Sequence, residues 1–141
     1  MKLVDANVLL YAVNVDAVAH ERSRRWLDDA LSGAETVAFS WMALLAFVRL
    51  ATKVSLFPSP LTVDEAMDRV DAWLAAPSAV VVEPTVRHAA IVRDLLDAVG
   101  VGGNLVNDAH LAALAIEHRC RIVSFDNDFG RFPGVDWSLP G

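Results

Sequence analysis

Short apolar runs alternate with longer segments of helical periodicity along this chain, and that alternation constrains the fold more than any other feature. The runs lie at residues 2–4, 36–40, 79–82 and 121–125, and a last one is expected at 135–137. They are apolar almost throughout, which is typical of strands that helices cover on both faces. Strands separated by helices pair in parallel. The sequence therefore predicts an α/β fold, a three-layer sandwich with a mainly parallel central sheet flanked by helices.

The helical segments carry recognisable start and stop signals. Thr62 and Glu65 have the spacing of a capping box, and the apolar residues behind them follow the helical period. The segment 41–53 is so rich in apolar residues that it predicts a buried helix. A later helix is expected to begin at Asn107 or Asp108, after a glycine-rich break.

Length and hydropathy bound the organisation of the chain. Its 141 residues fit one domain, which we expect to span residues 1–141. Hydrophobic residues make up 55% of the chain, a high share for a small monomer, and this predicts that a partner covers some apolar surface. Asp5 and Asn7 interrupt the apolar start, and no apolar run is long enough for a membrane span. We expect a cytoplasmic protein with no membrane partner.

Charge and cysteine content exclude several classes of protein. The net charge of −6 argues against a passive nucleic-acid binder, because such proteins neutralise phosphates with basic residues. It does not argue against a nuclease that gathers carboxylates around a metal ion, because the ion restores positive charge locally. Cys120 is the one cysteine, so an internal disulfide and a cysteine-based zinc site are excluded; we expect it to be a small buried residue.

Four aspartates form the most informative pattern. Asp5 and Asp126 each follow the end of an expected strand, and Asp128 comes two residues later. Ligand sites in open α/β sheets lie beyond the carboxyl ends of the strands. Asp108 falls in the first turn of an expected helix, and it reaches the same place only if that helix starts at the same edge of the sheet.

A group of carboxylates in one place predicts a site for a hard divalent cation. Mg²⁺ and Mn²⁺ prefer oxygen ligands, and a cation held in this way activates water and neutralises charge on a scissile phosphate. Without a cation the carboxylates would repel one another and raise each other's pKa values. We therefore predict that Asp5, Asp108 and Asp126 bind Mg²⁺ or Mn²⁺, with Asp128 acting directly or through water.

Each of these residues also has a purely structural interpretation. Asp108 is a favourable charge for a helix start, and Asp128 suits a turn. Three further residues are candidate supports for the site: Asn7, Ser40 and Asn104. Asn7 alternatively opens the next helix, Ser40 alternatively caps one, and Asn104 lies one helical turn before Asp108.

Three segments in order resemble the PIN-domain ribonucleases. Leu3-Val4-Asp5-Ala6-Asn7-Val8-Leu9-Leu10 is similar to the strand and Asp-x-Asn with which that family begins. Asn107-Asp108-Ala109-His110-Leu111-Ala112-Ala113-Leu114-Ala115 resembles its central aspartate-bearing helix, and Ile122-Val123-Ser124-Phe125-Asp126-Asn127-Asp128-Phe129 resembles its last strand and Asp-x-Asp-Phe segment. The match covers nearly the whole chain and looks like a mycobacterial-style subgroup of VapC toxins.

The resemblance implies more than the residues themselves do. It implies a PIN-like fold and a metal-dependent endoribonuclease toxin, acting on a structured RNA such as tRNA or rRNA. It also implies a homodimer that a VapB-type antitoxin neutralises, and both partners would account for the surplus of apolar residues.

One departure from the family pattern bears on catalysis. Many PIN nucleases carry a glutamate in the helix after the second strand, and the corresponding position here, near Ala46 or Phe47, has no acid. A weakened PIN-fold protein that only binds RNA or a protein is therefore an alternative. An aspartate-dependent phosphatase is a second alternative, which Asn7 disfavours because phosphatases of the haloacid-dehalogenase type have an aspartate there.

Two groups of arginines remain outside this pattern. Arg22, Arg24 and Arg25 form a basic strip that we interpret as a solvated helix face, with contact to RNA or antitoxin as the alternative. Arg49 lies one turn from the position of the absent acid, where a phosphate or an antitoxin acid is a possible contact.

Overall fold

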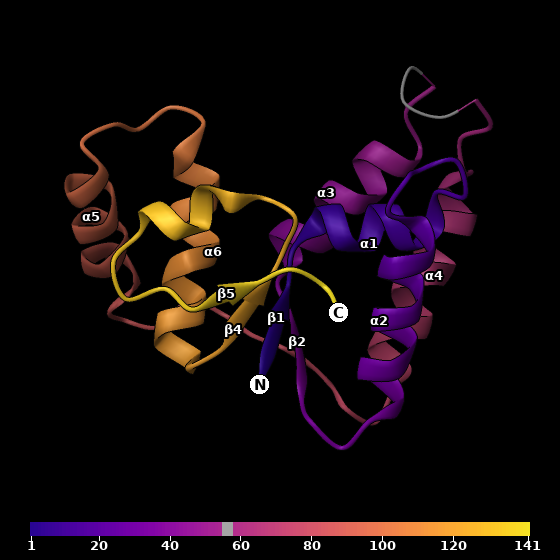
Figure 1. Ribbon diagram of the computed structural model, residues 1–141, viewed down its shortest axis with the longest axis horizontal. Helices are drawn as coiled ribbons and strands as arrows, with labels where there is room; N and C mark the ends of the chain where they lie inside the picture. The colour runs from indigo at the N-terminus through magenta and orange to yellow at the C-terminus, as the bar shows by residue number, and fades with distance from the viewer. Residues whose placement is uncertain (55–57) are drawn as a thin grey trace.

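The computed structural model describes residues 1–54 and 58–141, and Figure 1 shows the path of the chain. Its strands are β1 (Lys2–Val4), β2 (Val37–Phe39), β3 (Ala79–Val81), β4 (Arg121–Val123) and β5 (Trp137–Ser138). Its helices are α1 (Ala6–Val13), α2 (His20–Ser32), α3 (Trp41–Ala51), α4 (Val63–Ala75), α5 (His88–Val99), α6 (Leu105–His118) and the 3₁₀ helix η1 (Asn127–Arg131).

The five strands form one sheet in the order β3-β2-β1-β4-β5, and every neighbouring pair is parallel. The first strand of the chain is thus the central strand of the sheet. The predicted parallel sheet is confirmed, and the last strand lies at Trp137–Ser138, slightly later than the expected 135–137.

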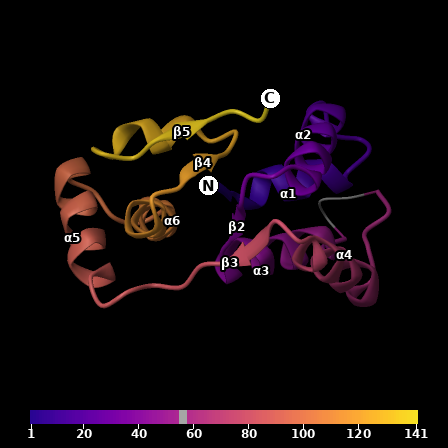
Figure 2. The ribbon, with the colours of Figure 1, turned by 90° about the horizontal axis from the view of Figure 1, so that it is seen from below.

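Side chains alternate across the strands and build a separate core on each face of the sheet. Leu3 and Ile122 point into a core with α5 and α6, whereas Val4 and Val123 point into a core with α1 to α4. Figures 1 and 2 show these two groups of helices on opposite sides of the sheet. The architecture is therefore the expected three-layer sandwich, with both faces of the sheet covered.

The helix predictions hold with two corrections. The capping box at Thr62 and Glu65 is present. The last long helix, α6, begins at Leu105 rather than at Asn107 or Asp108. Leu105 packs into the core, which favours a helix that starts at this earlier residue. The apolar helix α3 is buried on one face only, since the side chains of Trp41 and Leu45 are 41% and 56% exposed.

Helices α5 and α6 are joined by polar contacts as well as by apolar packing. The Glu117 carboxylate on α6 accepts hydrogen bonds from Thr85 and faces Nδ1 of His88 at 2.6 Å. Nε2 of His88 lies 2.9 Å from Nδ1 of His110. His88 and His110 therefore join α5 to the helix that carries Asp108.

Two further expectations concern Cys120 and membranes. The Cys120 side chain is buried, as predicted. Within the part of the chain that the structure describes, no helix is long and apolar enough to cross a membrane.

Candidate metal centre

Asp5 stands at the carboxyl end of the central strand, where the chain turns into α1. Its N–H donates to the carbonyl of Val123 at 3.0 Å, so the β1–β4 pairing continues up to this residue. Its Oδ1 accepts from the N–H of Ala6 at 2.7 Å, which makes Asp5 the N-cap of α1. The second carboxylate oxygen, Oδ2, is left to face the neighbouring strand.

Ser124 connects the aspartates of β1 and β4, and sequence reasoning missed it. Its fully buried hydroxyl donates to Oδ2 of Asp5 at 2.6 Å and accepts from the N–H of Asp126 at 2.9 Å. Strand register explains the position, because Val4 pairs with Val123 and the next residues on each strand are Asp5 and Ser124. A polar residue at the end of a buried apolar strand was the available signal.

Asn7 supports the same junction from the first turn of α1. Its Nδ2 donates to Oδ2 of Asp5 at 3.3 Å and to Oγ of Ser124 at 3.2 Å. Its Oδ1 accepts from the N–H of Phe125 at 3.2 Å. The amide of Asn7 therefore ties α1 to the segment after β4 and holds the Asp5 carboxylate in one orientation.

Asp108, Asp126 and Asp128 converge beside this junction. Each offers one carboxylate oxygen, and these three oxygens all lie within 4.8 Å of one another. Asp126 caps η1 by accepting from the N–H of Asp128 at 2.9 Å. Arg131 pairs with this group, with 3.8 Å between its Nη1 and Oδ1 of Asp128. The crossover through α5 thus brings the start of α6 to the edge of the sheet where Asp126 lies.

The pKa shifts in this group show that the negatively charged carboxylates repel one another when no cation is bound. Burial, which is the largest cause, and the negative charges of Asp126, Asp5 and Asp128 together raise the pKa of Asp108 to about 7. Burial also raises the pKa of Asp5, although hydrogen bonds from Ser124 and Ala6 oppose this rise. A divalent cation among the oxygens would relieve the repulsion, and all-oxygen ligands suit Mg²⁺ or Mn²⁺.

A small hollow of about 120 Å³ lies against Asp5 and Asp108. Met42, Ala43 and Ala46 of α3 form its opposite wall. Ala46 is thus the residue that occupies the expected position of the acid, whereas the side chain of Phe47 is fully buried in the core. The α3 wall of the hollow therefore presents the methyl groups of Ala43 and Ala46 and the thioether of Met42 to the aspartates, and no further carboxylate.

The two remaining predicted supports, Ser40 and Asn104, do not line the hollow. Ser40 is the N-cap of α3, and its buried hydroxyl accepts from the N–H of Ala43 at 3.1 Å, which is the alternative that the sequence left open. Asn104 is exposed at the start of α6 and makes no side-chain cap, whereas Asn107 lines the hollow beside Asp108. Asn107 was not among the candidate site residues predicted from the sequence.

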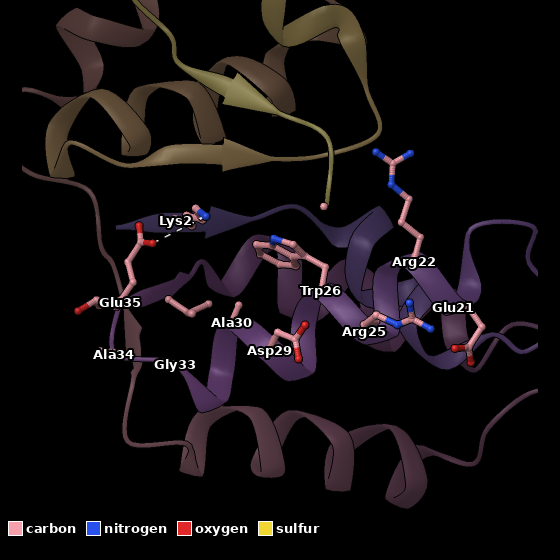
Figure 3. A pocket seen from close by; sticks show the side chains of 13 residues that line it. Lys2, Glu21, Arg22, Arg25, Trp26, Asp29, Ala30, Gly33, Ala34 and Glu35 are labelled. Carbon is pink, nitrogen blue, oxygen red and sulfur yellow. Dashed lines mark ion pairs between the residues drawn. The ribbon is translucent and has the colours of Figure 1, made fainter.

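A larger groove of about 610 Å³ lies along α2, away from the aspartates, and Figure 3 shows its lining. The basic strip is divided there. Arg24 pairs with Glu21 and Asp28 on the solvated face, as interpreted. Arg22 donates from Nε to the carbonyl of Pro140 at 2.6 Å, and Arg25 lines the groove. Arg24 therefore belongs to the solvated face of α2, whereas Arg22 and Arg25 both line the groove.

We expect Ser124→Ala to weaken metal binding about tenfold and to lower the free energy of unfolding by about 1–3 kcal/mol, because Asp5 and the Asp126 N–H lose a buried partner. Titration with Mn²⁺ and urea unfolding measure the two effects. Ser40→Ala is the matched control, since it removes a buried capping hydroxyl outside the carboxylates. Equal metal affinity in both variants would contradict a positioning role for Ser124.

Comparison with known proteins agrees with this architecture. A family model described as PIN domain matches residues 2–135. Ribonuclease VapC37 of Mycobacterium tuberculosis (strain ATCC 25618 / H37Rv) is 66% identical over 140 residues, which span 99% of this chain and 97% of the relative. Ribonuclease VapC33 of the same strain is 35% identical over 99% of this chain and 98% of the relative.

Solved structures share the fold at lower identity. VapBC2 from Rickettsia felis, bound to a DNA fragment from its promoter, superposes with a TM-score of 0.69 at 21% identity, over 98% of this chain and 97% of that chain. VapC20 of Mycobacterium tuberculosis, described as a sarcin-ricin loop cleaving toxin, superposes with a TM-score of 0.70 at 17% identity, over 96% of this chain and 99% of that chain. The likeness extends over the whole sandwich.

Proposed function

The chain belongs to the PIN-domain family of VapC ribonucleases, and on that premise we propose that it is a metal-dependent endoribonuclease toxin. The observation that carries the proposal is the convergence of three aspartate oxygens within 4.8 Å, with Asp5 held beside them by Ser124. Names of relatives supply the substrate class, RNA, and the site supplies the chemistry that hydrolysis of a phosphodiester requires.

In this proposal Asp5, Asp108 and Asp126 hold Mg²⁺ or Mn²⁺, and Asp128 contributes directly or through water. A bound cation supplies Lewis acidity, activates water and offsets the charge that develops on the phosphate. The chain's own residues hold these ligands in place: Ser124 and Asn7 fix Oδ2 of Asp5, and the η1 cap fixes Oδ1 of Asp126. Because these side chains are already held in position, less conformational entropy is lost when the substrate binds.

The test is cleavage of total RNA by the purified chain, with Mg²⁺ or Mn²⁺ and with chelator, beside the Asp5→Asn variant. We expect discrete fragments that require metal and disappear in the variant, and mapping their ends would identify the target, for which we propose a structured RNA such as tRNA or rRNA. Intact RNA with either metal, from a folded sample free of antitoxin, would favour the weakened binding protein, with Ala46 as the reason.

We also propose a VapB-type antitoxin and a second copy of the chain as partners. The exposed apolar side chains of Trp41 and Leu45 on α3 support this, because isolated monomers rarely expose neighbouring large apolar residues. Light scattering on the purified chain measures its oligomeric state. Co-expression with a short DNA-binding protein encoded next to it tests for a stable complex that no longer cleaves RNA.

The raised pKa of Asp108 predicts how stability depends on pH in the absence of metal. Because this pKa lies near 7 in the folded protein and near 3.8 in the unfolded chain, the folded state holds the proton more tightly. The stabilising contribution is therefore complete below pH 3.8 and is lost as pH rises to about 7.

Thermal unfolding in chelator between about pH 5 and pH 8 measures this dependence, with Asp108→Asn as the comparison. We expect the variant to gain about 1–2 kcal/mol over the wild type as pH rises, a value reduced for screening by water at a half-exposed group. Parallel curves for the two proteins would contradict the assignment of this dependence to Asp108.

A further inference from the structure

The wall of α3 that faces the aspartates continues beyond the hollow. Met42 and Ala46 line that hollow together with Asp5 and Asp108, and they are one helical turn apart. Arg49 follows three residues after Ala46 and seven after Met42. At about 100° per residue, seven residues bring Arg49 to within about 20° of the direction of Met42, so Arg49 belongs to the same row.

Helix geometry directs the Arg49 side chain back toward the hollow. Side chains on a helix lean toward its N-terminus and cover the surface about one turn before their own Cα. For Arg49 that surface lies between Leu45 and Ala46, four and three residues earlier, and Ala46 lines the hollow. The N-terminus of α3, capped by Ser40, lies at the carboxyl end of β2, the same edge of the sheet as Asp5. Arg49 therefore lies one helical turn beyond Ala46 on the row of α3 residues that borders the hollow.

The charges around the hollow leave a role for such a cation. Its lining holds two aspartates and no basic side chain. Arg131 is already paired with Asp128. Arg49 is exposed, and in residues 1–54 and 58–141 its guanidinium makes no ion pair or hydrogen bond. An RNA strand that reaches the aspartates has phosphates on either side of the scissile one, and those phosphates need cationic partners.

We propose that Arg49 binds a backbone phosphate of the RNA next to the scissile one. This inference rests on the proposed ribonuclease activity and assigns the residue that places the strand against the α3 wall. A guanidinium suits the task because its fork of N–H groups matches two phosphate oxygens. Arg49 is a substrate-binding residue here and takes no part in holding the cation.

The experiment compares Arg49→Ala, Arg49→Lys and Arg69→Ala. Arg69 is an exposed arginine on α4 that lies outside the hollow, so it is matched for the loss of one charge. Binding of a fluorescein-labelled single-stranded RNA is measured by anisotropy in an Asp5→Asn background, which prevents cleavage, over about 50–200 mM KCl. KM and kcat are measured for the same RNA without the Asp5 substitution.

We expect Arg49→Ala to raise Kd and KM about tenfold with little change in kcat. The slope of log Kd against log salt should fall by about 0.7, the value for one phosphate contact with a single strand. Arg49→Lys should keep most of the salt slope, and Arg69→Ala should match the parent in every measurement.

Two results would overturn the inference, and they are distinguishable. If the wild type cleaves RNA and Arg49→Ala binds it as tightly and with the same salt slope as Arg69→Ala, Arg49 does not bind the strand. Loss of antitoxin inhibition in that variant would then assign Arg49 to a protein contact. If the wild type neither cleaves nor binds RNA, the proposed function fails and the inference fails with it.

Discussion

Asp126→Asn is expected to lower the rate of RNA cleavage by more than about 100-fold while the fold remains intact. The substitution removes one negative charge from the three converging oxygens. It keeps an oxygen at Oδ1, so the hydrogen bond from the Asp128 N–H that caps η1 survives. The loss should therefore appear in metal affinity and kcat rather than in the unfolding temperature, and calorimetry with Mn²⁺ separates these quantities.

Asp136→Asn is the control for this prediction. Asp136 is an exposed acid that pairs with Arg121 and lies outside the aspartate group. Cleavage by the control should equal that of the wild type. Retention of cleavage by Asp126→Asn, or equal losses in the two variants, would remove Asp126 from the site.

Ala46→Glu is expected to raise affinity for Mn²⁺ at least about tenfold, because the new carboxylate enters the hollow that Asp5 and Asp108 line. The same substitution should lower stability in chelator by about 1 kcal/mol, since it adds a like charge to a group that is already in repulsion. Opposite effects with and without metal are the signature of a ligand, and thermal unfolding under both conditions measures them.

Leu45→Glu is the matched comparison, one residue away on the exposed face of α3. It adds the same charge but points away from the hollow, so metal affinity should not change. Equal metal affinity in the two variants would show that the wall at Ala46 is not within reach of the cation.

The strands and the aspartates that follow them were predictable from the sequence because both depend on local patterns. An apolar run that ends in Asp5 places that residue at the carboxyl edge of a parallel sheet whatever the remaining topology is. The same reasoning placed Asp126. The capping box at Thr62 and Glu65 was readable because its two hydrogen bonds join residues three apart.

Other parts of the site depend on how distant segments meet, and periodicity does not encode that. Asp108 joins the group only because the crossover brings the start of α6 to the edge that holds Asp126. The contact between Ser124 and Asp5 spans 119 positions and follows from strand register. The sequence left open whether Ser40 caps a helix or supports the site, and the structure shows the cap, in which its Oγ accepts from the N–H of Ala43.

The central place of β1 has a consequence for synthesis on the ribosome. β1 is synthesised first, but its neighbour β4 is synthesised near the end of the chain, so the two strands pair late. Ser124, Asp126 and Asp128 follow β4 in the sequence. A nascent chain that stops before residue 121 has an unpaired edge on β1 and lacks two of the four aspartates. The protein therefore completes its group of four aspartates only when translation is almost finished.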